Sequence, residues 1–151
     1  MQIEMTDSKG LVQKAVGNSQ VMTIGQITRT IRTLENTVTT SAHAGTTTDT
    51  GITPPAGCRI LGYKLEILSV TGVPAGAITD LGFKAGDVDA ISGTTDLALA
   101  MNAVGTLVRP AADPVRNVNV PATEIMITHE AAGAADRSCE VRVSIVIEEF
   151  S

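Results

Sequence analysis

The chain has 151 residues and a formal net charge of −5, and 43% of its residues are hydrophobic although only 2% are aromatic. A domain of this size buries a normal core, but here Val, Ile, Leu, Ala and Met must build it, and the abundance of β-branched residues favours an all-β fold. The acidic balance excludes the basic surface of a nucleic-acid-binding protein, and the shortage of aromatic rings excludes a stacking platform for single strands.

The first 30 residues differ from the rest, because Gln, Asn, Ser and Gly alternate there with isolated apolar residues. Residues 11–16 have the spacing of a single helical turn. A disordered terminus is one interpretation, but the apolar content favours an arm that becomes ordered against a neighbouring subunit. We therefore predict an N-terminal arm over residues 1–30 and a β-sandwich domain over residues 31–151.

The sequence also carries no targeting signal that we can identify. Its first residues are polar and acidic, whereas a secretory signal needs a basic and then an apolar region. The most apolar stretch, residues 97–108, is too short for the roughly 20 residues that span a bilayer. We expect synthesis in the cytoplasm and no membrane association.

The first strands of the predicted domain lie between residues 31 and 70. Residues 31–40 alternate with period two, residues 46–52 form a short or edge strand, and a turn at residues 54–57 follows. Residues 59–70 are expected to form the longest strand. Its predicted inner face consists of Leu61, Tyr63, Leu65 and Ile67.

The second half of the domain continues with short strands. Residues 77–83 are predicted to form a strand, residues 86–96 a loop, and residues 97–103 either a short helix or a buried strand, between which periodicity cannot decide. A loop at residues 109–114 and strands over residues 115–120, 123–131 and 139–150 complete the domain. The last strand alternates cleanly, with Val141, Val143, Ile145 and Ile147 inward and Arg142, Ser144 and Glu148 outward.

About eight closely spaced strands predict an antiparallel β-sandwich, similar to a jelly roll, with at most one short helix. Both cysteines, Cys58 and Cys139, lie in strand-like segments. We expect two buried, reduced thiols, although a single disulfide between neighbouring strands is the alternative.

No catalytic or metal-binding constellation emerges from the residue pattern. His43 lies in a small-residue turn and His129 at a strand end, and both are interpreted as surface histidines. The carboxylates of Asp87, Asp89 and Asp96 with Ser92 suggest a calcium loop, but the Gly and final Glu of that loop are missing, so a structural turn is favoured. Nucleophile-elbow and phosphate-loop motifs are absent from the sequence. We expect no enzyme activity, cofactor, metal or small-molecule substrate.

One segment resembles a known group of proteins. The run GITPPAGCRILGYKLEIL, followed by AITDLGFKAGDVDAISGTTDLALAMNAVGT, resembles the β-sandwich modules of tailed-bacteriophage virion proteins. The resemblance rests on the corner Pro55, Ala56 and Gly57 before a long strand, and on the later turn of Gly86, Asp87 and Asp89.

This resemblance implies a capsid decoration, or cement, protein that binds the outside of a phage capsid as a homo-oligomer, with a trimer favoured. The expected partners are the major capsid protein and further copies of the chain, and the expected location is the virion surface after synthesis in the host bacterium. The apolar residues of the arm and their flanking lysines are the candidate capsid or subunit contacts: Lys9, Leu11, Val12, Lys14, Val16 and Ile24.

The alternative function is a phage tail or fibre-associated module that binds the host. In that case the side chains of two distal loops, residues 86–96 and 109–114, would carry host recognition. The two functions predict different contact surfaces on the same sandwich.

Overall fold

The computed structural model describes residues 2–6, 12–16, 19–24, 27–41, 46–112, 120–130 and 136–151. Within these residues the regular secondary structure is entirely β, and no helix is long and apolar enough to cross a bilayer. The strands are β1 (Gln2–Thr6), β2 (Val12–Val16), β3 (Ser19–Ile24), β4 (Ile27–Ser41), β5 (Thr47–Asp49), β6 (Arg59–Thr71), β7 (Ala77–Phe83), β8 (Leu99–Ala100), β9 (Gly105–Pro110), β10 (Ile125–His129) and β11 (Ser138–Phe150).

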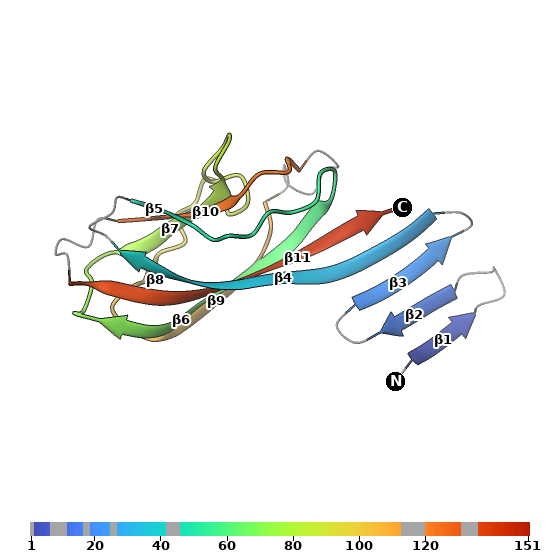
Figure 1. The fold of residues 1–151 in the computed structure, drawn as a ribbon, viewed down its shortest axis with the longest axis horizontal. Coiled ribbons are helices and arrows are strands. Elements are labelled where there is room, and N and C mark those ends of the chain that lie inside the picture. Colours follow the sequence, from blue (N-terminus) through green and yellow to red (C-terminus); the bar gives the residue numbers. More distant parts are fainter. Residues whose placement is uncertain are drawn as a thin grey trace.

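The strands form two antiparallel sheets. One has seven strands in the order β1-β2-β3-β4-β11-β6-β9, and the other has four in the order β5-β10-β7-β8. In Figure 1, β5, β7 and β10 lie over β4, β11 and β6, whereas β1, β2 and β3 extend the larger sheet beyond this covered part. The all-β sandwich predicted from the sequence is therefore confirmed.

The eight strands from β4 to β11 have the jelly-roll arrangement. Counted from β4, one sheet holds the first, eighth, third and sixth strands, and the other holds the second, seventh, fourth and fifth. Consecutive strands mostly alternate between the sheets, so each sheet contains strands from both ends of the domain. The last strand, β11, lies in the interior of the larger sheet, where it pairs with β4 on one side and β6 on the other.

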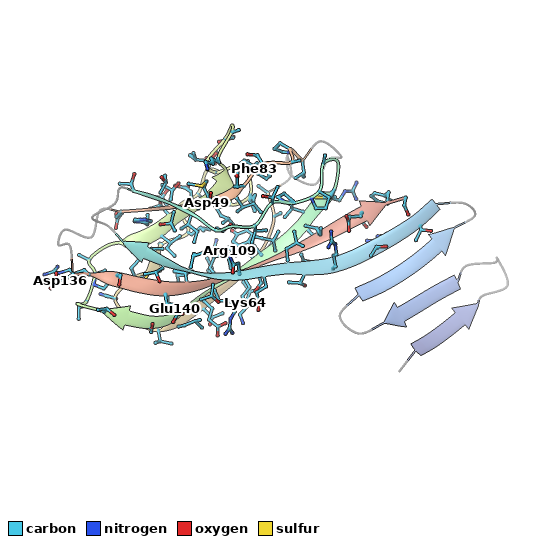
Figure 2. All side chains as sticks on the ribbon, in the orientation of Figure 1. Asp49, Lys64, Phe83, Arg109, Asp136 and Glu140 are labelled. Carbon is cyan, nitrogen blue, oxygen red and sulfur yellow. The ribbon has the colours of Figure 1, made fainter. Side chains whose placement is uncertain are left out.

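The core lies between β11 and the smaller sheet. The four predicted inward residues of β11, Val141, Val143, Ile145 and Ile147, are each fully buried. They belong to one buried cluster with Leu81 and the isoleucines of β7 and β10. Figure 2 shows side chains filling the space between the two sheets. Full burial of one such aliphatic side chain contributes about 1.5–3 kcal/mol, so the alternation of β11 determines which face of the strand turns inward.

The predicted inner face of β6 was wrong at one position. Ile60 is fully buried, whereas Leu61 is only partly buried. The register between β6 and β11 shifts at this point, because Val146 is opposite Gly62 but Ile147 is opposite Ile60. A β-bulge of this kind inserts one residue and reverses the facing of the strand beyond it. The longest strand is β4, with 15 residues, rather than β6, with 13.

Other predictions can be compared element by element. Residues 46–52 contain the edge strand β5, and residues 123–131 contain β10, as expected. The ambiguous stretch at residues 97–103 contains the two-residue strand β8 rather than a helix. Residues 12–16 form strand β2 rather than a helical turn. The strand predicted at residues 115–120 falls almost wholly outside the described residues.

Candidate interaction surfaces

The two cysteines are buried, free thiols. Cys58 is 2% exposed, Cys139 is 1% exposed, and no disulfide joins them. Burial, with a smaller contribution from the nearby carboxylate of Glu149, raises the pKa of the Cys58 thiol to about 11. Burial also raises the pKa of Cys139, whose Sγ lies 2.9 Å from Oγ1 of Thr40. The thiolate is the reactive form of a cysteine, and a raised pKa keeps both thiols protonated. Both side chains therefore act as core residues.

His129 is a buried residue, so its interpretation as a surface histidine was wrong. Its side chain is 1% exposed. Nδ1 lies 3.2 Å from the carbonyl oxygen of Glu130, which can only accept, so Nδ1 donates and Nε2 is left to accept from the hydroxyl of Thr48 at 3.2 Å. The imidazole thus connects β10 to the edge strand β5. His43 lies outside the described residues.

The acidic loop after β7 is held by its own backbone. The amide of Asp89 donates to Oδ1 of Asp87 at 3.4 Å, and the amide of Phe83 donates to the carbonyl oxygen of Asp87 at 3.0 Å. A hydrogen bond with the Asp87 carboxyl group raises the pKa of Asp89. In the described part of the chain, no three potential metal ligands come together. These hydrogen bonds hold the turn.

The outer face of the larger sheet, which is turned away from the smaller sheet, carries paired charges. Lys64 lies 3.0 Å and Arg142 3.4 Å from the carboxylate of Glu66, and Ser144 donates to Glu35 at 2.6 Å. In Figure 2 the labelled Lys64 and Glu140 point away from the smaller sheet, on which Asp49 and Phe83 are labelled. This face therefore presents both positive and negative side chains to a partner, rather than a strong electrostatic potential of a single sign.

Glu148 is an exception to the expected outward, solvated pattern of β11. It does lie on the outer face, but it is only 1% exposed, because it forms ion pairs with Arg29 from β4 and Arg59 from β6. The Arg59 guanidinium also lies 6.0 Å from the centroid of the Phe150 ring, which is 47% exposed. Sequence alternation placed Glu148 on the correct face but could not reveal the two arginines that cover it.

A depression lies beside β4 and the loop after β5. It is lined by residues 33–36 and 51–53. The side-chain amide of Asn36, one of these lining residues, donates to the carbonyl oxygen of Thr50 at 2.9 Å. Glu35 is the one ionisable side chain among these lining residues, so they offer no acid-base pair for catalysis.

The six predicted arm contacts lie in the N-terminal part of the chain. Val12, Lys14 and Val16 belong to strand β2, and Ile24 is the last residue of β3. Lys9 and Leu11 lie outside the described residues. Their role as capsid or subunit contacts stays a prediction.

The chain also shares its fold with a solved structure. A chain of the structure described as "Cyanophage Pam1 capsid asymmetric unit" aligns with a TM-score of 0.52 and 18% sequence identity, over 78% of the present chain and 84% of that chain. No family model matches the sequence, and no curated protein matches it either. At this identity the likeness defines a common fold, the jelly-roll sandwich described above.

Proposed function

We propose that this protein is a structural, non-catalytic component of a phage virion that binds the outside of the capsid and stabilises it as a decoration protein. The fold likeness to a chain of a cyanophage capsid asymmetric unit carries the proposal, because it extends over most of both chains. Jelly rolls are a recurrent architecture of viral capsid domains, which agrees with this role. Fold alone does not define function, so the surfaces of the chain must supply the rest of the argument.

Two surfaces support a role in assembly. The sheet formed by β1, β2 and β3 extends past the smaller sheet, so it makes no substantial contact with β5, β7, β8 or β10. A sheet normally buries at least one face against another layer, and here a partner would supply that layer. The second surface is the outer face with its paired charges, which can match a mixed-charge partner. The proposed partners are the major capsid protein and other copies of the chain, as a trimer.

Binding of the protein would stabilise the assembled capsid through thermodynamic linkage between binding and assembly. A protein that binds the assembled shell but not its dissociated subunits lowers the free energy of the shell in proportion to the logarithm of its own concentration. The location that follows is the capsid surface of the virion. Synthesis would take place in the cytoplasm of the bacterial host.

Co-sedimentation with capsids tests this function directly. Capsids that lack the protein, assembled from the major capsid protein encoded in the same genome, are mixed with the purified chain and sedimented through sucrose. We expect saturable binding and a higher disassembly temperature of the decorated capsids. If the full-length chain stays in the supernatant at all concentrations, the decoration function is wrong.

A deletion of residues 1–25 tests the arm. Because β4 begins at Ile27, this deletion removes β1, β2 and β3 but retains all eight strands of the jelly roll. We expect a cooperative unfolding transition like that of the full chain and loss of capsid binding. Full capsid binding by the shortened protein would exclude the arm as the contact.

One observation favours the host-binding alternative enough to include it in the test. The amide of Ala112 donates to the carbonyl oxygen of Ile91 at 3.0 Å, so the two distal loops of that hypothesis meet at one end of the sandwich. Adsorption of fluorescently labelled protein to host cells, without capsid binding, would support this second function in place of decoration.

A further inference from the structure

Strand β9 ends the larger sheet on the side of the sandwich. It pairs with β6 on one side, and within the described residues no strand pairs with its other side. Val108, near the middle of β9, is 69% exposed, and Val104, just before the strand, is 72% exposed. A strand edge with exposed apolar side chains can pair with another chain unless charges or a covering segment protect it.

The hydrogen-bond phase of β9 identifies the backbone groups that this edge presents. The amide of Ala111 donates to the carbonyl oxygen of Leu61 at 3.1 Å, so Ala111 points its backbone groups towards β6. Because this orientation alternates along a strand, Leu107 also bonds to β6, whereas Thr106 and Val108 point their amide and carbonyl groups to the open side. The edge therefore offers both donors and acceptors to an added strand.

The strands at the two ends of the smaller sheet are less suited to accept a partner. β5 has three residues and β8 has two, whereas β9 has six. On β5, the carboxylate of Asp49 pairs with Lys84 at 3.3 Å. Short length and charge are the usual protections of a sheet edge, and both are weaker at β9.

We propose that β9 of one copy pairs antiparallel with β9 of a second copy about a two-fold axis at Leu107, so that Thr106 of each copy is opposite Val108 of the other. The contact is isologous, because both copies use the same edge. It goes beyond the proposed function, since it requires neither capsid binding nor the trimer. In a trimer each copy would keep this edge, which would then join copies of two neighbouring trimers.

The proposed register satisfies the hydrogen-bonding ladder and joins like faces. Thr106 and Val108 both point their backbone groups to the open side, so each opposed pair donates in both directions. Both side chains belong to the outer face, because Val108 is opposite Lys64, which is opposite Ser144 of β11. The pairing thus continues the larger sheet from one copy into the next with both outer faces on the same side.

The inner face of β9 is also complementary to itself in this register. Leu107, which packs against the core, is opposite Leu107 of the second copy at a non-hydrogen-bonded position, where side chains are closest. Arg109 is opposite Gly105 of the second copy. A Cβ atom at Gly105 would meet only a Leu99 methyl group at 3.9 Å, so this position leaves room for the guanidinium. The cation of β9 therefore meets no like charge on the facing strand.

Two neighbouring registers are less favourable. A two-fold axis at Arg109 would place two guanidinium groups opposite each other, and like charges at directly opposed positions destabilise a strand pair. An axis at Val108 would place Pro110 opposite Thr106 of the second copy, and proline has no amide proton to complete that pair.

The charges on β6 favour the same register. Lys64 is opposite Val108, and Glu66 is opposite Thr106. An axis at Leu107 therefore puts Lys64 of one copy in the same row as Glu66 of the other, whereas an axis at Val108 would put the two copies of Lys64 in one row. Because the edge complements itself in side chains, backbone groups and charge, a second copy is the partner that fits it.

Disulfide trapping tests the register. The variants Leu107→Cys, Val108→Cys and Arg109→Cys are oxidised separately, and the products are separated by mass under denaturing conditions. Opposed residues at a non-hydrogen-bonded position have Cα atoms about 4.5 Å apart, which suits a disulfide. We expect Leu107→Cys to give crosslinked dimers as its main product. The native cysteines are buried.

Arg109→Cys is the matched control, because it places a more exposed thiol on the same face of the same strand. In the proposed register the two thiols of this variant are offset by four residues, roughly 14 Å at about 3.4 Å per residue. It should therefore give little crosslinked dimer, and so should Val108→Cys, whose thiols are offset by two residues. Crosslinking mainly through position 108 or 109, or equally through all three, would overturn the register.

A backbone variant tests the edge independently of any thiol. Val108→Pro removes an amide that points to the open side and leaves the ladder with β6 intact, whereas Val108→Thr keeps the amide. We expect sedimentation to show that the proline variant has half the mass of the wild-type assembly, with a similar melting temperature. The threonine variant should retain the wild-type mass.

This halving is expected whether or not the trimer forms, because the contact joins assemblies in pairs. An unchanged mass for Val108→Pro, or a wild-type chain that is a monomer or an unpaired trimer, would exclude the β9 contact. Capsid co-sedimentation of the same variants reports separately on the decoration function, so the failure of one proposal is distinguishable from the failure of the other.

Discussion

The guanidinium of Arg32 donates two hydrogen bonds to the carboxylate of Glu149, from Nε to Oε2 at 2.7 Å and from Nη2 to Oε1 at 3.2 Å. The two residues lie on β4 and β11, 117 positions apart in the sequence. This bidentate pair is diagonal across the two strands, since Arg32 is opposite Ile147. It connects the first and last strands of the jelly roll.

A double-mutant cycle with Arg32→Ala and Glu149→Ala should give a coupling free energy of about 0.5–1 kcal/mol in urea unfolding, because both side chains are partly exposed. The coupling should shrink as salt is added. Lys84 and Asp49 form a more exposed, monodentate pair at 3.3 Å and serve as the control, with a smaller coupling expected. Equal coupling in the two pairs would contradict the importance of the bidentate geometry.

Gly82 should not tolerate a side chain. A Cβ atom there would lie 2.2 Å from the backbone carbonyl group of Val88, which belongs to the loop that passes over β7. Because backbone must move to relieve this clash, Gly82→Ala should lower the free energy of unfolding by about 2–4 kcal/mol. In Gly105→Ala the new Cβ meets only a Leu99 methyl group at 3.9 Å, and the thermal melt should change little. Similar melting temperatures for the two variants would show that the loop containing Val88 can move away at little cost in free energy.

Glu148→Gln should destabilise the protein by about 2–3 kcal/mol, because it removes the charge that compensates Arg29 and Arg59 at a buried position. Glu140→Gln, on the same face of β11 but exposed, should change the unfolding free energy by less than about 0.5 kcal/mol. Chemical denaturation of both variants measures the difference. If Glu148→Gln left the free energy of unfolding unchanged, packing around this side chain would matter more than its charge.

Thr48→Val should cost about 1–3 kcal/mol, because it leaves Nε2 of the buried His129 without its hydroxyl partner. Thr47→Val, at the exposed neighbouring position of β5, provides the control and should be nearly neutral. Hydrogen exchange of the β5 and β10 amides should quicken in the first variant alone. Equal exchange in both would show that this hydrogen bond does not anchor the edge strand.

The Cys58 thiol should resist alkylation at pH 8 in the native protein and react after unfolding. Its pKa is raised from an ordinary 9.0 to about 11, so the native state holds the proton more tightly than the unfolded state. The resulting stability is fully present below pH 9 and is lost as the pH rises from 9 towards 11, on the order of 2 kcal/mol in all. Cys58→Val should have a shallower loss over this range, and an unchanged slope would contradict the assigned burial effect.

The face that a strand turns towards the core was predictable from the sequence wherever apolar residues alternate with polar ones along the strand. The alternation of Val141, Val143, Ile145 and Ile147 in the sequence was sufficient to identify their face as the core. It failed at Leu61, because a bulge changes the register of β6 against β11, and the bulge depends on the paired strand rather than on β6 alone. Local periodicity cannot report a shift that exists only between two strands.

The sequence by itself determined the all-β class, the positions of β4, β5, β6, β7, β10 and β11, and the small aliphatic core, because these follow from β-branched content, turn residues and alternation. It did not predict the strands β1, β2, β3 and β9. Only the tertiary structure decided the jelly-roll order, the burial of His129 and Glu148, and which of the described strands stand at the ends of the two sheets. Each of these depends on contacts between residues tens of positions apart, such as Thr48 with His129 or Arg59 with Glu148. Such contacts arise from how the strands pair, which no single segment encodes.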